Sequence, residues 1–525
     1  MAARLSPAIA RQLGLALLVT IVLGGSWPYF ERMLDANERP RLLAGIALVE
    51  QGSVRIDGAN AHGLALGPDV ARARDGTLVP NKPPGATLVA SAAWLALEAR
   101  HALSGAAIDR RGYSLLARAL GALLPTLLLA FALWRRERAN DEAPAHVDFA
   151  LLAWLLATPA WANAKLLFGH SLAAALLGGG LLLLTPRDAP LRPARAALAG
   201  LLCASAITVE YTAVFAGPAI AIWLLVHFAR RWRVLAAALA GALGPIVGLA
   251  LYHQAVFGSP WTTGYHRAAH DEFAAIHGRG LLGLQWPSLA SAWEHLLSPW
   301  GGALIWCPLA LLGLLAGAWA ARTEARPESR ARHALFAAVG LSLFAVLLGL
   351  EQGGGWRVGP RYFVIGLPLA VPGLVVLTRE LTRRDRARAL GFTLLLGLFG
   401  ASLVYEFLAA NWFPHLIPHG NPLGDLLWPL ALAGQRVHGL PMWLIGLASA
   451  SLVGLALVRL ARASEHGLWP WLAGLALALV LIVSQSLGPI RDPDAASELA
   501  AIRAIAEPDR EGRSPASAVL LEASR

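Results

Sequence analysis

The first polar stretch of the chain holds two acids whose spacing could support chemistry. Asp35 and Glu38 lie three residues apart in "DANERPR", so they share one face if a helix begins that early. Partial desolvation at a lipid boundary would raise the basicity of such a pair, which could then accept a proton from an attacking hydroxyl or hold a divalent cation. The simpler alternative is solvated loop charge, with Glu38 paired along the helix to Arg41.

A lysine follows in "DGTLVPNKPPGATLVA". Lys82 and Lys165 are the only lysines among 44 basic residues, and an ammonium is a compact charge suited to phosphate. Pro83 and Pro84 prevent a helix from starting earlier, so Lys82 is fixed at the mouth of an apolar segment too short to span comfortably. The segment is therefore interfacial or re-entrant. Lys82 either binds a phosphate whose tail stays in lipid or only anchors the segment by snorkelling.

Further groups that could contact phosphate follow later in the chain. Arg357 and Arg361 come after three glycines in "EQGGGWRVGPRYF", where a guanidinium either forks onto phosphate or snorkels at a helix end. His170 follows Lys165 by five residues and could assist phosphate binding or proton transfer, or simply cap or pack. Glu210 lies near membrane depth, where an ionisable residue is costly and by default a functional hypothesis, unless it faces the outer interface.

The segment "FGSPWTTGYHRAAHDEF" offers aromatic rings and hydroxyls, which stack on sugar rings and bond to their hydroxyls. The residues expected to contact sugar or acceptor are Asp69, also a possible second acid, Trp261, Tyr265, His266 and Tyr362. His266, His270 and Asp271 do not complete a ligand set, so a zinc site is not expected there. Whether a divalent metal is used stays open, and no other cofactor is expected.

The composition indicates a polytopic membrane protein. Hydrophobic residues make up 56% of the 525, only 15% are charged, and mean hydropathy is +0.55. The net charge of +11 comes from short arginine clusters between apolar runs, so no nucleic-acid partner is expected. Cys203 and Cys307 lie within apolar stretches and predict no disulfide framework. The chain has no Walker loop and no dinucleotide or nucleotide-sugar motif, which favours a lipid-linked donor.

Apolar segments of roughly the 20 residues that a bilayer requires recur along the chain. The predicted spans lie at about 10–29, 113–134, 147–163, 168–185, 195–211, 213–229, 234–254, 303–320, 334–351, 361–377, 389–408, 440–458 and 468–487. Between the first two, "RPRLLAGIALVEQG" has apolar residues at helical spacing up to Gly52 and predicts an amphipathic helix on the outer surface. The sequence thus predicts an all-α polytopic protein with about 13 transmembrane helices.

Alternate loops carry the arginines, and the positive-inside rule places those loops in the cytoplasm. The long stretches 30–112, 254–302 and about 409–439 then lie outside. The N-terminus is expected inside and the C-terminus outside, with one transmembrane domain over 1–487 and an outer tail over 488–525. The wealth of Ala, Arg, Gly and Leu is typical of a GC-rich bacterial genome. These features predict a multi-pass protein of the bacterial inner membrane.

The order of several short motifs resembles the lipid-carrier-dependent glycosyltransferases of the GT-C superfamily, especially aminoarabinose transferases and protein mannosyltransferases. Those motifs are "DANERPR", "DGTLVPNKPPG", "FGSPWTTGY", "SPWGGALIWCPL" and "GPRYFVIGLPL", and the likeness runs from Trp27 to about Pro368. The resemblance implies a polyprenyl-phosphate-linked sugar donor and an extracytoplasmic active site. It maps the family's first-loop acid onto Glu38 or Asp35 and its phosphate-holding lysine onto Lys82. Asn81 stands where the aminoarabinose enzymes have a glutamate, which puts a metal role there in doubt.

The predicted reaction is sugar transfer from a polyprenyl phosphate to a lipid, glycan or protein acceptor. Asp35 or Glu38 would act as base, and Lys82 and Arg361 would stabilise the leaving phosphate, because fixed cations offset its developing charge. Further phosphate contacts are expected from Arg357, Lys165 and His170. A polysaccharide polymerase or ligase is the nearest rival. A lipid or solute transporter is another, although charged residues are scarce within the predicted spans.

Overall fold

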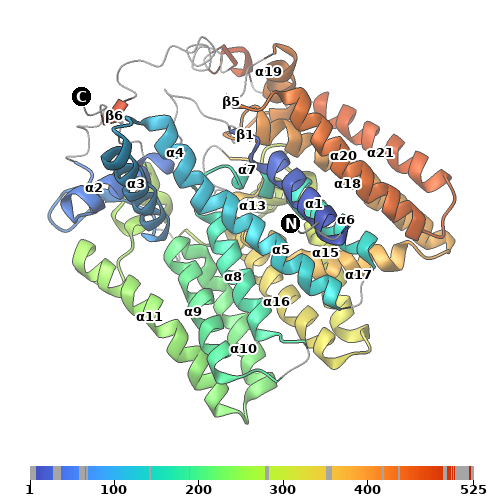
Figure 1. Cartoon of the computed structure of the whole chain (residues 1–525), viewed down its shortest axis with the longest axis horizontal. Helices are drawn as coiled ribbons and strands as arrows, with labels where there is room; N and C mark the ends of the chain where they lie inside the picture. Colours follow the sequence, from blue (N-terminus) through green and yellow to red (C-terminus); the bar gives the residue numbers. More distant parts are fainter. Residues whose placement is uncertain are drawn as a thin grey trace, which may run out of the picture.

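The fold is built almost entirely from helices (Figure 1). The computed structural model describes residues 7–27, 37–57, 66, 69–140, 143–187, 190–277, 283–350, 357–416, 419–434, 438–488, 493–497, 499–500, 502 and 519–521. Its α-helices are α1 Pro7–Gly24, α2 Glu38–Gln51, α3 Gly85–Ser104, α4 Arg110–Arg118, α5 Leu124–Ala139, α6 Pro144–Leu156, α7 Ala160–Asn163, α8 His170–Leu184, α9 Pro193–Val209, α10 Gly217–Phe228, α11 Trp232–Phe257, α12 Asp271–His277, α13 Leu289–Ala292, α14 Ala303–Trp306, α15 Pro308–Thr323, α16 Pro327–Gly349, α17 Val371–Leu381, α18 Arg386–Asn411, α19 Trp428–Leu432, α20 Met442–Ala463 and α21 Trp469–Ser486.

Short turns and strands complete the described part of the chain. The π-helical turns are η2 Ala119–Leu123, η5 Trp293–Leu297 and η8 Leu423–Leu427, and the 3₁₀ turns are η3 Tyr211–Ala216, η4 Gly264–Arg267, η6 Arg361–Phe363 and η7 Leu367–Ala370. The strands form three antiparallel pairs: β1 Ser26–Trp27 with β5 His438–Gly439, β2 Val70–Arg72 with β3 Leu78–Pro80, and β4 Ile108–Asp109 with β6 Val519–Leu521. Figure 1 shows β6 beside the start of α4, so the end of the chain returns to the first large loop.

Seven described helical segments are long and apolar enough to cross a membrane, and each overlaps a predicted span. They are Arg110–Ala139, Tyr211–Phe228, Trp232–Phe257, Pro327–Gly349, Arg386–Asn411, Met442–Ala463 and Trp469–Ser486. The all-α polytopic prediction is therefore confirmed, while the count of thirteen is not.

The other predicted spans fall on shorter or interrupted elements. Five of them correspond to α1, α6, α8, α9 and α15, whose apolar parts have 10 to 17 residues each. The predicted span at 361–377 was wrong as a continuous helix. The chain there forms the 3₁₀ turns η6 and η7 before α17, and Pro368 and Pro372 remove backbone donors in this stretch.

The first large loop folds into packed helices. The predicted end of α2 at Gly52 is confirmed, since this residue has φ 63 in the left-handed region, where glycine carries no steric cost. The surface position expected for α2 was wrong for its first half, because the residues from Pro40 to Ala47 are buried. α3 begins directly after Pro84 as predicted, but its 20 residues exceed the short segment that was expected.

Some loops that the sequence assigns to one side of the membrane contact each other. Arg379 lies in the last turn of α17, before the arginine-rich loop between α17 and α18, and pairs with Glu324, in the loop between α15 and α16, at 2.6 Å. The backbone amide of Arg384 in the loop between α17 and α18 donates to Glu465, in the loop between α20 and α21, at 2.7 Å. On the opposite side, the first large loop meets the start of the second large loop, because the Arg74 amide donates to Val256 O at 2.9 Å. Segments assigned to one side therefore meet one another.

Helices α9 and α11 cross through a reciprocal pair of glycines. A methyl group on Gly200 would overlap the carbonyl oxygen of Ala238, and one on Gly241 would overlap that of Ala197. Small residues at a crossing allow helix backbones to approach closely in membranes. Gly244, one turn further along α11, has no heavy atom within 4 Å of such a methyl group.

We expect Gly241→Ala to destabilise the fold and Gly244→Ala to leave its stability unchanged. The added methyl group of the first variant must push two backbones apart, and overpacking of this kind costs about 1–3 kcal/mol. Unfolding in mixed micelles, followed by tryptophan fluorescence, measures the free energy of unfolding for both variants. Equal stability of the two would show that the α9–α11 crossing is looser than described.

Candidate functional site

Lys82 is positioned by a close contact between the start of α3 and the end of α9. A methyl group on Gly85 would lie 2.7 Å from Thr208 O and 2.6 Å from Val209 Cγ2, so only glycine fits without a shift. Glu210 follows Val209 directly, and its carboxylate interacts electrostatically with Lys82. Packing of the two helix ends thus brings a lysine and a glutamate together.

The second large loop covers the same lysine. Lys82 Nζ donates to the Tyr265 hydroxyl at 3.1 Å and lies 4.5 Å from the centre of its ring. A methyl group on Gly264 would overlap the Asn81 backbone, so this glycine permits the loop to sit directly on the lysine segment. Only 5% of Lys82 is exposed. Its ammonium is therefore held against an aromatic wall.

Arg41 reaches the same place from α2. Its guanidinium donates to Asn37 Oδ1 and to Leu167 O, the latter at 2.9 Å, and is fully buried. Within the described part of the chain, its Nε and Nη2 have no hydrogen-bond partner. Buried polar atoms are normally satisfied, so this cation has donors available for a ligand.

Glu210 and His170 form a buried pair beside these cations. Glu210 Oε2 lies 3.6 Å from His170 Nδ1, and each side chain is 2% exposed. The charges of Lys82, Arg41 and Arg361 act on the Glu210 carboxylate, which offsets part of their positive charge. His170 is the first residue of α8. It follows Gly169, whose φ of 87 lies in the left-handed region that favours glycine.

Arg361 and Tyr362 come from the turn η6. The Arg361 guanidinium lies 5.4 Å from the centre of the Phe168 ring and 5.2 Å from that of Tyr362. The Tyr362 ring meets the His170 ring edge-on at 5.9 Å. Arg361 interacts electrostatically with both Arg41 and Glu210, which places all of these groups in one neighbourhood.

Asp69 is the half-buried carboxylate of this neighbourhood. It accepts a hydrogen bond from Asn81 Nδ2 at 3.3 Å, and its charge acts on Arg41, Glu210 and Tyr265. We call the whole group the Lys82 cluster; its members are Arg41, Asp69, Lys82, His170, Glu210, Tyr265, Arg361 and Tyr362. Three of these residues are cations and two are carboxylates, so the cluster has an excess of one positive charge with His170 neutral.

Glu38 lies in a different setting from the expected one. It is fully buried and accepts from Arg118 Nε at 2.9 Å, from Arg118 Nη2 at 2.6 Å and from the Leu167 amide at 2.6 Å. The alternative of a solvated pairing with Arg41 was therefore wrong, because the partner is an arginine 80 positions away, while the catalytic role predicted for Glu38 stays a prediction. Asp35 lies outside the described residues, and its role stays a prediction.

Four other predicted residues lie apart from the cluster or at its edge. Lys165 is fully buried and donates to Ser26 Oγ and Asn411 Oδ1, both at 2.7 Å. Arg357 pairs with Glu294 at 2.9 Å and is 1% exposed. Trp261 is 85% exposed, and His266 accepts from the Thr263 amide at 3.1 Å to cap η4. Arg357 lies at the edge of the cluster, because its charge interacts electrostatically with Arg361 and Tyr362.

Arg41 was missed as a site residue, although the sequence contained a signal. The run "LLAGIAL" after it is apolar on consecutive residues, which indicates a helix buried on several faces rather than on one stripe. A charged residue at the edge of such a run must find partners inside the protein. Among the described residues, no group of three or more His, Cys, Asp or Glu is arranged to hold a metal ion.

Several solved structures are similar to this chain, including the following two. The crystal structure of ArnT from Cupriavidus metallidurans bound to undecaprenyl phosphate shares 16% identity and a TM-score of 0.49, covering 92% of this chain and 78% of that one. The cryo-EM structure of arabinosyltransferase EmbB from Mycobacterium smegmatis shares 13% identity and a TM-score of 0.40, covering 93% of this chain and 42% of that one. No family model and no curated protein matches the chain.

We expect Arg118→Met to destabilise the protein strongly. The substitution leaves Glu38 buried without its cation, and breaking a buried pair from one side costs roughly 3–5 kcal/mol. Arg55→Met is the matched control, since the Arg55–Asp75 pair is 57% and 36% exposed and such pairs contribute little. Chemical unfolding of both variants tests this, and equal stability would contradict a structural role for Glu38.

Proposed function

We propose that the protein transfers a sugar from a polyprenyl-phosphate-linked donor to an acceptor at the outer face of a bacterial inner membrane. The observation that carries this proposal is the convergence of Arg41, Lys82 and Arg361, all at most 6% exposed, among apolar helices. Their excess positive charge lies in a low-dielectric setting, where a phosphate gains far more than it would in water. The ligand class is thus a phosphate on an apolar chain. Undecaprenyl phosphate, bound in the ArnT structure, is one such compound.

The three cations have distinct parts in the proposed reaction. Lys82 supplies a compact charge to the phosphate, while Arg41 offers the two nitrogens that no described residue accepts from. Arg361, stacked beside Phe168 and Tyr362, presents a guanidinium to the same anion. As the bond between the anomeric carbon and the phosphate oxygen breaks, the phosphate keeps the electron pair. The fixed cations lower the barrier because they stabilise that charge.

Asp69 is the carboxylate we favour as base. It is partly exposed, so an acceptor hydroxyl or amine can approach it, and its charge interacts with that of Arg41. The acceptor oxygen or nitrogen attacks the anomeric carbon and gives its proton to Asp69, with inversion as the expectation for a single displacement. Glu38 holds Arg118 instead, and Asp35 is the alternative base.

The remaining members of the cluster have positioning and binding roles in this proposal. Glu210 partly balances the three cations, which would otherwise repel one another when no donor is bound. His170 orients Glu210. Tyr265 and Tyr362 supply rings on which a sugar can stack, and we assign acceptor contacts to Trp261 and His266 because both are exposed.

We expect Lys82→Met to lower kcat/KM for sugar release by about a hundredfold or more, since loss of one preorganised charge contact has an effect of that size. Purified protein and radiolabelled polyprenyl-phosphate sugars provide the assay. Arg72→Met is the control, because this arginine lies in the same loop but is exposed. Full activity of Lys82→Met would remove the phosphate role. Passage of donor across proteoliposomes without sugar release would favour a transporter.

We expect Asp69→Asn to lower kcat by about 10²–10⁴-fold, the usual contribution of a positioned base, with little change in donor binding. Single-turnover rates and donor affinity measured separately distinguish these two effects. Asp35→Asn is assayed in parallel. An active Asp69→Asn enzyme alongside an inactive Asp35→Asn enzyme would transfer the base role to Asp35.

A further inference from the structure

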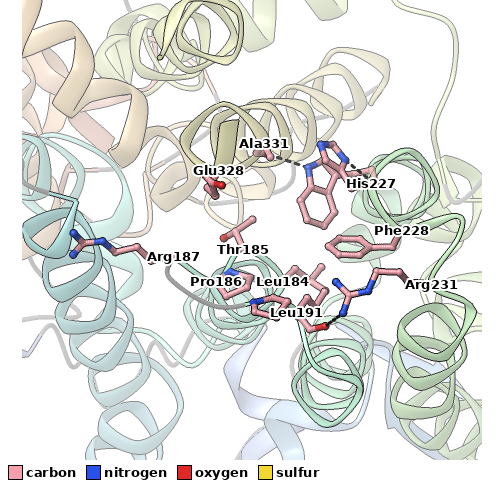
Figure 2. Close-up of a pocket in the computed structure, with 12 residues that line it drawn as sticks. Leu184, Thr185, Pro186, Arg187, Leu191, His227, Phe228, Arg231, Glu328 and Ala331 are labelled. Atoms are coloured by element: carbon pink, nitrogen blue, oxygen red, sulfur yellow. Dashed lines mark hydrogen bonds between the residues drawn. The ribbon is translucent and has the colours of Figure 1, made fainter. Parts of the chain in front are cut away.

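A cavity of about 490 Å³ lies at the arginine-rich end of the helices, and Figure 2 shows the residues that line it. It is lined by the end of α8, the end of α10, the start of α16 and the segments beside them. We propose that this cavity binds the headgroup of a glycerophospholipid, one that carries a phosphate diester and a hydrogen-bond donor. The inference does not depend on the proposed function.

The cavity has an ordered aromatic wall. Trp223 Nε1 donates to Ala331 O at 2.9 Å, which ties α10 to α16. The His227 ring stacks on Trp223 with centres 4.6 Å apart and an interplanar angle of 26°, and the Phe228 ring meets Trp223 at 5.6 Å. These contacts fix the rings, so the wall is formed before any ligand enters.

The charges of the lining are mixed and match a particular headgroup. Arg231 donates to Leu191 O at 3.1 Å and lies 5.7 Å from the Phe228 ring, which holds its guanidinium at the cavity. Glu328 also lines the space, and Figure 2 shows it at a different edge from Arg231. Arg187 lines it too, but its guanidinium points outward in that view. A phosphate suits the arginine, and an amine or hydroxyl on the same headgroup suits the glutamate.

The surroundings favour a lipid over a soluble phosphate compound. Trp232 is 67% exposed beside Arg233, whose guanidinium lies 5.7 Å from the ring, a pairing typical of the membrane boundary. The spans at Tyr211–Phe228 and Trp232–Phe257 are only 22% and 17% buried, so they present apolar surface to lipid. Acyl chains can lie along that surface while the headgroup occupies the cavity.

This site is separate from the Lys82 cluster. His170 begins α8 and Leu184 ends it, so the helix places the two sites roughly 20 Å apart, at 1.5 Å per residue. A lipid held here would lie in the leaflet opposite to the proposed donor.

Native mass spectrometry of the full chain, released from detergent micelles with defined lipids, tests the proposal. We expect retained phosphatidylethanolamine and phosphatidylglycerol to fall about tenfold in Arg231→Gln, since a charge-assisted hydrogen bond is lost. Glu328→Gln should weaken both lipids, whereas phosphatidylcholine, which lacks a headgroup donor, should bind weakly throughout. Arg230→Gln is the matched control, being exposed and outside the lining.

Ala331→Phe provides a second variant that fills the cavity and keeps the backbone acceptor for Trp223. We expect it to exclude the lipid while the thermal unfolding midpoint stays near wild type. Equal lipid retention by wild type, Arg231→Gln and Ala331→Phe would overturn the proposal. Displacement of lipid by millimolar glycerol phosphate or inorganic phosphate would also overturn it, in favour of a soluble phosphate ligand.

Discussion

The Lys82 cluster depends on one valine held between two glycines. Val209 Cγ2 lies against Gly85 and Val209 Cγ1 lies 3.2 Å from where a methyl group on Gly169 would be. The first contact fixes the lysine that precedes α3, and the second fixes the histidine that opens α8. Glu210 is the next residue after the valine, so its carboxylate is delivered between them. A larger residue at either glycine would separate groups that must act together.

Burial makes the charge arrangement consequential. Glu38 and Arg118 satisfy each other inside the protein, and the Leu167 amide completes the carboxylate's bonds, so this pair has little capacity for a ligand. The carbonyl oxygen of the same residue, Leu167, accepts from Arg41, whose Nε and Nη2 have no hydrogen-bond partner among the described residues. Leu167 thus contacts both the neutralised Glu38–Arg118 pair and the cation Arg41. In a low-dielectric interior, an anion is therefore stabilised by Arg41 but not by Arg118, whose charge Glu38 already neutralises.

Local patterns in the sequence were sufficient for several features of this fold. Two prolines predicted where α3 begins, and a glycine predicted where α2 ends. Hydropathy located the long spans, but it predicted one continuous helix over 361–377 where the chain forms two 3₁₀ turns before α17. Hydropathy does not register that prolines in this stretch interrupt the backbone hydrogen bonds of a helix. Lys82, Asp69, Tyr265 and Arg361 were singled out from the sequence, and the structure brings them into one neighbourhood. The burial of Arg41 and the partner of Glu38 were not predicted, since both depend on contacts between segments 80 or more positions apart.

The pairing of β1 with β5 has a consequence for the timing of biogenesis. Ser26 and Trp27 at the end of α1 find their strand partners about 400 residues later, in His438 and Gly439. At a synthesis rate of roughly 5–20 residues per second, that interval is roughly 20–80 seconds. Lys165 shares the delay, because its ammonium is bonded both to Ser26 and to Asn411. The insertion machinery must therefore tolerate an early helix whose end, and a buried charge beside it, wait for the last third of the polypeptide to arrive.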